Sequence, residues 1–256
     1  LEASDVVMVA RGDLGVEIGD AAVPPVQKRI LRKAPKFNCP VIVATQMMES
    51  MCENPVPTRA EVNDVANAVI DGTDAVMLSG ESAAGKYPVE AVAAMDRTCM
   101  ETERHRVFPA QSTRDPRYPP QSVNECIARS VMDASRMMPL KAIVTFTESG
   151  NTALYMSRHL GEVPIYALTP SQSTRGRVSL YRNVTPIILN RQYREATDAP
   201  QATDDAIKLM FDHDIVDQDS LVAMTMGTPM GKSGATNMMK IVRAGNHLPG
   251  EDSKTK

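Results

Sequence analysis

The chain has 256 residues, of which 43% are hydrophobic and 23% are charged, a composition typical of a globular protein and unlike that of a disordered one. Its formal net charge of −3 excludes a broad basic field, so nucleic acid and anionic membrane are poor candidates as partners. No apolar run reaches the roughly 18 residues that a membrane-spanning helix needs. The four cysteines and four histidines lie far apart, which argues against a zinc site and predicts reduced thiols in a cytoplasmic protein.

The first hundred residues alternate between short apolar runs and helical patterns. Predicted strands cover 6–9, 41–44 and 75–78, and predicted helices cover 26–36, 58–70 and a stretch that starts at Tyr87-Pro88. The runs are continuous rather than alternating, as expected of strands buried on both faces. Thr58 and Glu61 form a predicted capping box, and in the third helix we expect Val89, Val92, Ala93 and Met100 to point inward. The strands begin roughly 35 residues apart, which predicts consecutive βα units of a parallel α/β fold.

A Pro-rich stretch, 107–121, predicts a linker between a first domain, 1–106, and a second domain, 122–256. The alternation of strands and helices then resumes. Predicted strands cover 142–146, 165–168, 186–189, 221–226 and 238–242, and predicted helices cover 122–138, 152–160, 174–181 and 202–213. The second domain is therefore expected to be an open α/β sheet.

Polar residues follow each of the first three predicted strands. Arg11-Gly12-Asp13 follows the first strand, Thr45 the second and Ser79 the third. Parallel strands bring their carboxyl ends to one rim, where α/β folds bind ligands. Gly12 allows backbone N–H groups to approach an anion, and Asp13 is a natural oxygen ligand for Mg²⁺. The alternative is that Asp13 only caps a turn and that both hydroxyls satisfy local backbone groups.

Four motifs, correctly ordered and spaced, give the chain a specific resemblance to a known family. They are 8–17 (MVARGDLGVE), 44–51 (ATQMMESM), 57–74 (PTRAEV followed by DVANAVIDGTD) and 77–88 (MLSGE with GKYP). The sequence resembles pyruvate kinases along essentially its whole length. The resemblance implies the last three βα units of a (β/α)₈ barrel, and so a partial barrel, followed by the regulatory C-terminal α/β domain of the family.

Pyruvate kinases transfer the phosphoryl group of phosphoenolpyruvate to ADP, with Mg²⁺ and usually K⁺, and are usually homotetramers. By resemblance, Asp13 binds the metal, the Arg11-Gly12-Asp13 segment and Thr45 hold the substrate carboxylate, and Thr45 and Ser79 act in proton delivery. The family's other metal, phosphate, potassium and ADP contacts precede Leu1. We therefore expect a fragment that is inactive alone.

Two later segments are candidate anion sites. Residues 147–152 (TESGNT) follow a predicted strand and open a helix, so the candidates are Thr147, Glu148, Ser149, Gly150, Asn151 and Thr152. Helix capping explains such residues equally well. By resemblance they match the effector loop of the family, and Gly231, Lys232 and Gly234 match its second loop. Because Glu148 stands where some bisphosphate-activated members carry lysine, we predict a monophosphate effector, AMP or a sugar monophosphate.

Two other functions remain open. The chain could be a non-catalytic regulatory module that binds sugar phosphates or nucleotide monophosphates through its C-terminal domain. It could also be a structural subunit that completes a barrel with a separately encoded half.

Overall fold

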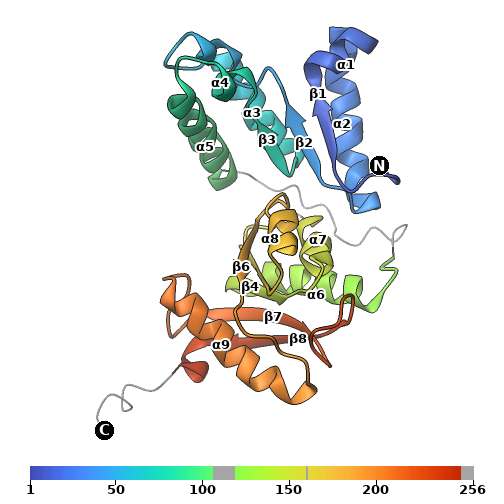
Figure 1. Ribbon diagram of the computed structural model, residues 1–256, viewed down its shortest axis with the longest axis vertical. Coiled ribbons are helices and arrows are strands. Elements are labelled where there is room, and N and C mark those ends of the chain that lie inside the picture. Colours follow the sequence, from blue (N-terminus) through green and yellow to red (C-terminus); the bar gives the residue numbers. More distant parts are fainter. Residues whose placement is uncertain (106–118, 160, 249–256) are drawn as a thin grey trace. The chain divides into compact units, whose positions relative to one another are not determined.

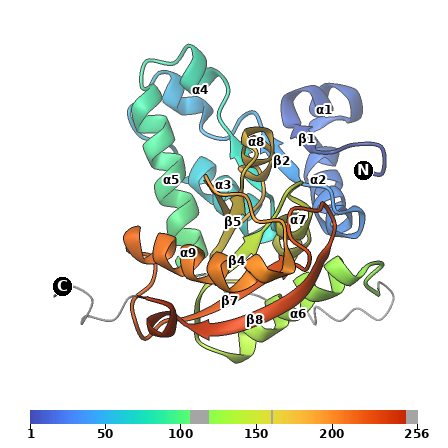
Figure 2. The ribbon, with the colours of Figure 1, turned by 60° about the horizontal axis from the view of Figure 1, so that its bottom comes forward.

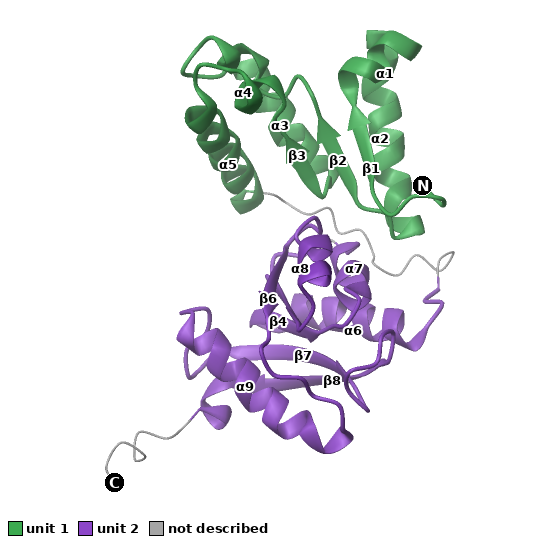
Figure 3. Cartoon of the chain, viewed as in Figure 1, with its two compact units in different colours: residues 1–110 green, residues 111–256 purple. Residues whose placement is uncertain are grey.

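The computed structural model describes residues 1–105, 119–159 and 161–248. The chain forms two compact units, Leu1–Ala110 and Gln111–Lys256 (Figure 3). The predicted linker, 107–121, lies mostly outside the described residues, so the proposed domain boundaries remain predictions. Across the described ranges, no helix is both long and apolar enough to cross a membrane.

Unit 1 is a three-stranded parallel sheet in the order β1-β2-β3, with helices between the strands (Figure 1). Its elements are β1 (Val7–Ala10), α1 (Arg11–Ile18), η1 (Asp20–Ala22), α2 (Val23–Lys33), η2 (Ala34–Phe37), β2 (Val41–Ala44), η3 (Glu49–Cys52), α3 (Arg59–Asp71), β3 (Ala75–Met77), α4 (Gly80–Ala83) and α5 (Pro88–Arg104). In the register, Ala10 is level with Ala44, and Ala44 with Met77. The three strand ends therefore meet at one rim, as the sequence predicts.

The core of unit 1 lies between the strands and helices α2, α3 and α5. The capping box of α3 is confirmed: the Thr58 hydroxyl accepts from the Glu61 N–H, and the Glu61 carboxylate accepts from the Thr58 N–H. Gly72 follows the helix in the left-handed conformation, with φ of 89°, as a helix C-cap requires.

Two expectations for unit 1 were wrong in part, and one helix was missed. Met8 of β1 is 50% exposed, so β1 is not buried on both faces, whereas Val41, Val43 and Ala44 of β2 are buried as expected. In α5 the inward face consists of Ala91, Ala94 and Met95, and the two small alanine side chains allow α5 to pack closely on α3. The predicted inward residues Val89, Val92 and Met100 are instead 74%, 53% and 46% exposed. Helix α1 was missed, because two glycines in eight residues weaken its helical signal.

Unit 2 is a five-stranded sheet in the order β6-β5-β4-β7-β8, parallel except for the edge strand β8. Its elements are α6 (Val123–Met137), β4 (Leu140–Phe146), α7 (Asn151–Ser157), β5 (Ile165–Thr169), α8 (Gln172–Val178), β6 (Val184–Ile188), η4 (Ala196–Asp198), α9 (Ala199–Asp212), β7 (Leu221–Gly227), β8 (Thr236–Arg243) and η5 (Ala244–His247). Every predicted strand and helix of this half is present. The predicted α/β class and open sheet are thereby confirmed.

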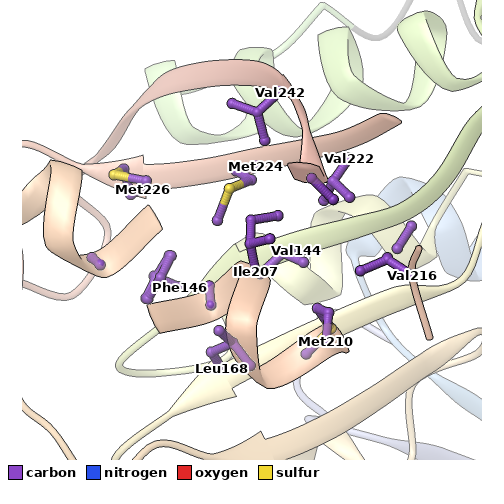
Figure 4. Close-up of a cluster of buried hydrophobic side chains, with 14 of the residues drawn as sticks. Val144, Phe146, Leu168, Ile207, Met210, Val216, Val222, Met224, Met226 and Val242 are labelled. Atoms are coloured by element: carbon purple, nitrogen blue, oxygen red, sulfur yellow. The ribbon is translucent and has the colours of Figure 1, made fainter. Parts of the chain in front are cut away.

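Helices cover both faces of this sheet (Figure 2). Helix α9 packs on one face, where Ile207 lies among Val144 and Met224 of the neighbouring strands (Figure 4). Helices α6, α7 and α8 pack on the other face, against Ile143 and Ala223. Successive residues of β4 therefore point to opposite cores, which explains why its sequence is a continuous apolar run.

Candidate functional site

The ends of β1 and β2 are joined by side chains that the sequence singles out. The Gly12 N–H donates to the Thr45 hydroxyl at 3.0 Å. Arg11 donates from Nε and Nη2 to the Thr45 carbonyl, at 3.1 and 2.7 Å, and from Nη2 to the Gln46 carbonyl at 2.8 Å. Its Nη1 pairs with Asp64 of α3 at 2.5 Å. The Thr45 hydroxyl accepts from Gly12 and so keeps its own proton for another acceptor.

Thr45 and Gln46 are backbone outliers. Their φ angles are +65° and +55°, in the left-handed region that costs a non-glycine residue roughly 1–2 kcal/mol. Such outliers persist only where the surrounding structure holds them in place, and they are frequent at ligand sites. Here Arg11 holds both carbonyl groups, so the orientation of the Thr45 side chain depends on an arginine on the neighbouring strand end.

Asp13 and Ser79 lie at the same rim and are both exposed. Asp13 is in the first turn of α1, and Ser79 directly precedes α4. The loops after β2 and β3 are tied together by Glu81, a residue that is 2% exposed. Its carboxylate accepts from the Met48 N–H at 3.0 Å and from the Ser79 N–H at 2.7 Å. Sequence reasoning missed this role, although Glu81 stands two residues after Ser79 in the motif.

Glu61 supports the same loop from α3. Besides capping its helix, it accepts from the Ser50 N–H at 2.7 Å and from the Ser50 hydroxyl at 2.6 Å. Burial opposes ionisation of Glu61, but the hydrogen bonds from Ser50 and Thr58 outweigh it and lower its pKa from the ordinary 4.5. The segment after β2 is thus anchored at Thr45, Met48 and Ser50.

The described residues contain no group of three or more His, Cys, Asp or Glu side chains that could hold a metal ion. Asp13 offers an exposed carboxylate at the rim. Mg²⁺ is often bound through one or two carboxylates, with waters and substrate oxygens completing its shell. Asp13 therefore fits one ligand position of such a shell and does not form a site by itself.

In unit 2 the predicted anion loops meet in one small pocket of about 40 Å³. Predicted residues that line it are Thr147, Glu148, Ser149, Thr152, Gly231, Lys232 and Gly234. The Ser233 hydroxyl donates to the Ser149 hydroxyl at 2.9 Å, which joins the two loops directly. Gly150 and Asn151 do not line the pocket. Gly150 has φ of +86° and donates its N–H to the Thr147 hydroxyl at 2.9 Å, so it shapes the first loop.

The hydroxyl of Thr152, one of the predicted anion-binding residues, already makes hydrogen bonds within the protein. The Thr152 hydroxyl donates to the side-chain amide oxygen of Asn124 at 2.9 Å and lies 2.8 Å from the Thr236 hydroxyl. All three residues are at most 6% exposed. Thr152 therefore links the first loop to α6 and β8, and is better placed to position the loop than to contact a ligand. Helix α7 has only seven residues, which limits the helix-dipole contribution at its start.

A third wall of the pocket, from the loop after β6, was missed. It includes Arg191 and Tyr193. The Tyr193 ring meets Phe146 edge to face at 6.0 Å, and the Arg191 guanidinium lies 5.5 Å from the Tyr193 ring centroid. The Tyr193 hydroxyl donates to Asp205 at 2.5 Å, and burial together with this carboxylate raises the pKa of Tyr193. In the sequence, Arg191 and Tyr193 lie in an irregular segment and belong to no recognisable motif, so nothing there predicted this wall.

Comparisons with known proteins agree with both halves of this architecture. The family model "Pyruvate kinase, barrel domain" matches residues 1–92, and "Pyruvate kinase, alpha/beta domain" matches residues 125–242. The chain is 48% identical over 243 residues to pyruvate kinase II of Salmonella typhimurium, covering 94% of this chain and 49% of the relative. It is 42% identical over 252 residues to a Staphylococcus epidermidis pyruvate kinase, covering 98% and 42%.

A crystal structure of a pyruvate kinase from Cryptosporidium parvum superposes with a TM-score of 0.85 at 35% identity, over 94% of this chain and 47% of that one. The chain thus spans about half the length of the relatives it matches. With two family models matching consecutive parts of it, the chain belongs to the pyruvate kinase family.

Proposed function

We propose that this chain contributes part of the active site of a pyruvate kinase, which transfers the phosphoryl group of phosphoenolpyruvate to ADP. The observation that carries the proposal is the contact between the Gly12 N–H and the Thr45 hydroxyl, with Arg11 bound to the Thr45 carbonyl. It places the end of β1 against the end of β2 at the rim where the family signature predicts the substrate.

Asp13 is proposed to hold Mg²⁺ together with oxygens of the substrate, and no residue of this chain is assigned to K⁺. The ion would neutralise charge that develops on the substrate oxygens. The start of α1 would bind the substrate carboxylate, because the partial positive charge at a helix N-terminus attracts an anion. Arg11 already contacts two carbonyls and Asp64, so it serves mainly to fix this geometry.

Thr45 is proposed to deliver the proton that converts the enolate to pyruvate. Its hydroxyl accepts from Gly12 and has its own proton available on the rim. Ser79 is exposed at the neighbouring strand end, and no described residue hydrogen-bonds to its hydroxyl, so it is free to relay a proton through solvent. Replacement of Thr45 by Ser should retain this step, and replacement by Val should remove it.

The chain alone is proposed to be inactive, because the resemblance places further metal, phosphate and ADP contacts upstream of Leu1. Loss of one electrostatic group costs roughly 10²–10³ in rate, and loss of several multiplies this effect. The test is steady-state ATP formation by the chain, compared with Asp13→Ala. Turnover above that variant would refute inactivity. Co-expression with the amino-terminal half of a relative tests the complementing-subunit hypothesis: turnover that needs both halves and is lost in Asp13→Ala supports the assigned site.

A second proposed function is binding of a monophosphate, such as AMP or a sugar monophosphate, in the unit 2 pocket. Two cations and one carboxylate line it, Arg191, Lys232 and Glu148, so their net charge of +1 suits one phosphate better than two. Its volume of about 40 Å³ corresponds to a few waters, which suits a phosphate group. Calorimetric titration with ribose 5-phosphate, AMP and a sugar bisphosphate tests this; tight binding of the bisphosphate alone would contradict it. A melting shift with monophosphate but none with phosphoenolpyruvate and Mg²⁺ would favour the purely regulatory module.

The intact enzyme is proposed to be a homotetramer. Helix α3 exposes Val62 and Ile70, which are 37% and 53% exposed, and this supports a role of its outer face in assembly. Light scattering of a complemented enzyme should give four copies. A monomer of full activity would contradict the proposal.

A further inference from the structure

The wall of the unit 2 pocket that follows β6 contributes a cation, Arg191, and this cation is already paired. Its Nη1 atom lies 3.3 Å from the Oδ2 atom of Asp205, a residue of α9 that does not itself line the pocket. Its Nε and Nη2 atoms make no hydrogen bond to any residue that the structure describes. The Arg191 side chain is 61% exposed, so a ligand can reach it, but its charge lies next to a carboxylate.

Asp205 is held firmly in this position. Its Oδ2 atom also accepts from the Tyr193 hydroxyl at 2.5 Å, and its Oδ1 atom accepts from Nε2 of Gln201 at 2.8 Å. Both oxygens are therefore bonded, and the carboxylate cannot turn away from Arg191 without breaking one of these bonds. Burial opposes ionisation of Asp205, but the hydrogen bonds and Arg191 outweigh it and lower its pKa from the ordinary 3.8, so the group is charged at neutral pH.

The two loops on the other side of the pocket offer donors that remain available. Lys232 lines the pocket and makes no ion pair with any described residue. The Ser149 hydroxyl accepts from Ser233 and so keeps its own proton for another acceptor. One phosphate group can thus be bound by these loops without Arg191. A second phosphate on the same ligand would need another cation, and the described lining residues offer Arg191.

We propose that Asp205 makes this pocket selective for ligands with one phosphate group over ligands with two. The inference rests on the proposed monophosphate binding and assigns its selectivity to a residue outside the lining. Asp205 offsets the charge of Arg191 and repels a second phosphate that approaches it. Because Tyr193 and Gln201 also hold the carboxylate, an incoming phosphate cannot readily displace it. Asparagine would keep the shape and an oxygen acceptor but would remove the charge and release Arg191.

The test is calorimetric titration of the full 256-residue chain with fructose 6-phosphate and fructose 1,6-bisphosphate, which differ by one phosphate group. Wild type should bind the monophosphate at least about tenfold more tightly than the bisphosphate. Asp205→Asn should tighten bisphosphate binding about tenfold or more, and monophosphate binding by less than about threefold. The matched control is Asp212→Asn, the same charge change on α9 at a carboxylate that pairs with Lys208, and it should alter neither affinity.

A second variant distinguishes an action through Arg191 from a structural effect. The gain in bisphosphate affinity should disappear when Asp205→Asn is combined with Arg191→Gln. An unchanged preference in Asp205→Asn, a gain that persists without Arg191, or an equal gain in Asp212→Asn would overturn the inference. Loss of both ligands together with a fall of several degrees in Tm would make Asp205 a structural residue and would overturn it too. Wild type that binds neither sugar phosphate would instead contradict the proposed phosphate binding itself, and this inference with it.

Discussion

Replacing Glu81 by Gln tests how the rim is held together. Glu81 is 2% exposed, and its two oxygens accept from two backbone N–H groups, on Met48 at 3.0 Å and on Ser79 at 2.7 Å. Glutamine keeps the shape but turns one acceptor into a donor, which must face one of those N–H groups. The loss of one charge-assisted hydrogen bond and the burial of an unpaired N–H together predict a destabilisation of about 2–4 kcal/mol.

Urea unfolding measures the size of this destabilisation, and hydrogen–deuterium exchange of the folded protein measures its location. Exchange should accelerate in peptides that contain Met48 or Ser79 and stay unchanged in unit 2. Glu53→Gln is the matched control, because Glu53 pairs with Lys86 on the surface and its side chain is 68% exposed; it should leave the free energy of unfolding almost unchanged. Equal stability of Glu81→Gln and wild type, or faster exchange spread over both units, would refute the reasoning.

Three further predictions concern single residues. Hydrogen bonds lower the pKa of Glu61 in the folded state, so its contribution to folding stability is complete above its unfolded pKa, near 4.5, and is lost as pH falls through the lower folded value. The difference in unfolding free energy between wild type and Glu61→Gln, measured by urea titration at pH 7, 5 and 4, should therefore shrink as the pH falls. Tyr193 has a raised pKa, so its contribution to stability is complete below about pH 10 and is lost as pH rises through the folded value. In an ultraviolet titration, Tyr193→Phe should therefore lack one tyrosine that ionises above the ordinary range. Gly231→Ala should lower the free energy of unfolding by about 1–2 kcal/mol or more and weaken phosphate binding, since φ is +74° and the new Cβ would lie 3.0 Å from the Tyr193 carbonyl oxygen. Gly234→Ala, with φ of +73° and no atom within 4 Å of the new Cβ, should show only the cost of backbone strain in chemical denaturation.

The elements could be predicted because their signals are local. Mostly apolar runs located the eight strands of the described residues, and the Thr58–Glu61 box located the start of α3. The inward face of α5 could not be predicted from hydrophobicity, because small residues such as Ala91 and Ala94 are buried while larger valines stay exposed. Which face a helix buries depends on the shape of its neighbour, and that shape is not written in the helix's own sequence.

The candidate site could be predicted only to the level of strand ends. Thr45 was placed at the rim correctly, but its left-handed backbone and the arginine that supports it require contacts across 34 residues. Likewise, the Tyr193 wall of the unit 2 pocket comes from an irregular segment with no periodic signal. Spacing identifies residues that share an edge of a sheet, whereas hydrogen bonds between distant loops decide which atoms remain available to a ligand.

Arg11 shows why this distinction matters for mechanism. As a cation beside a predicted carboxylate site, it invites the interpretation that it binds substrate directly. Yet its guanidinium makes four contacts with oxygens of Thr45, Gln46 and Asp64, and its side chain is only 11% exposed. Lysine would keep the charge but could not reproduce this planar set of donors. An Arg11→Lys enzyme that lost activity would therefore not demonstrate lost substrate binding: relaxation of the strained Thr45 backbone would produce the same loss, and faster amide exchange around Gln46 would distinguish the two causes.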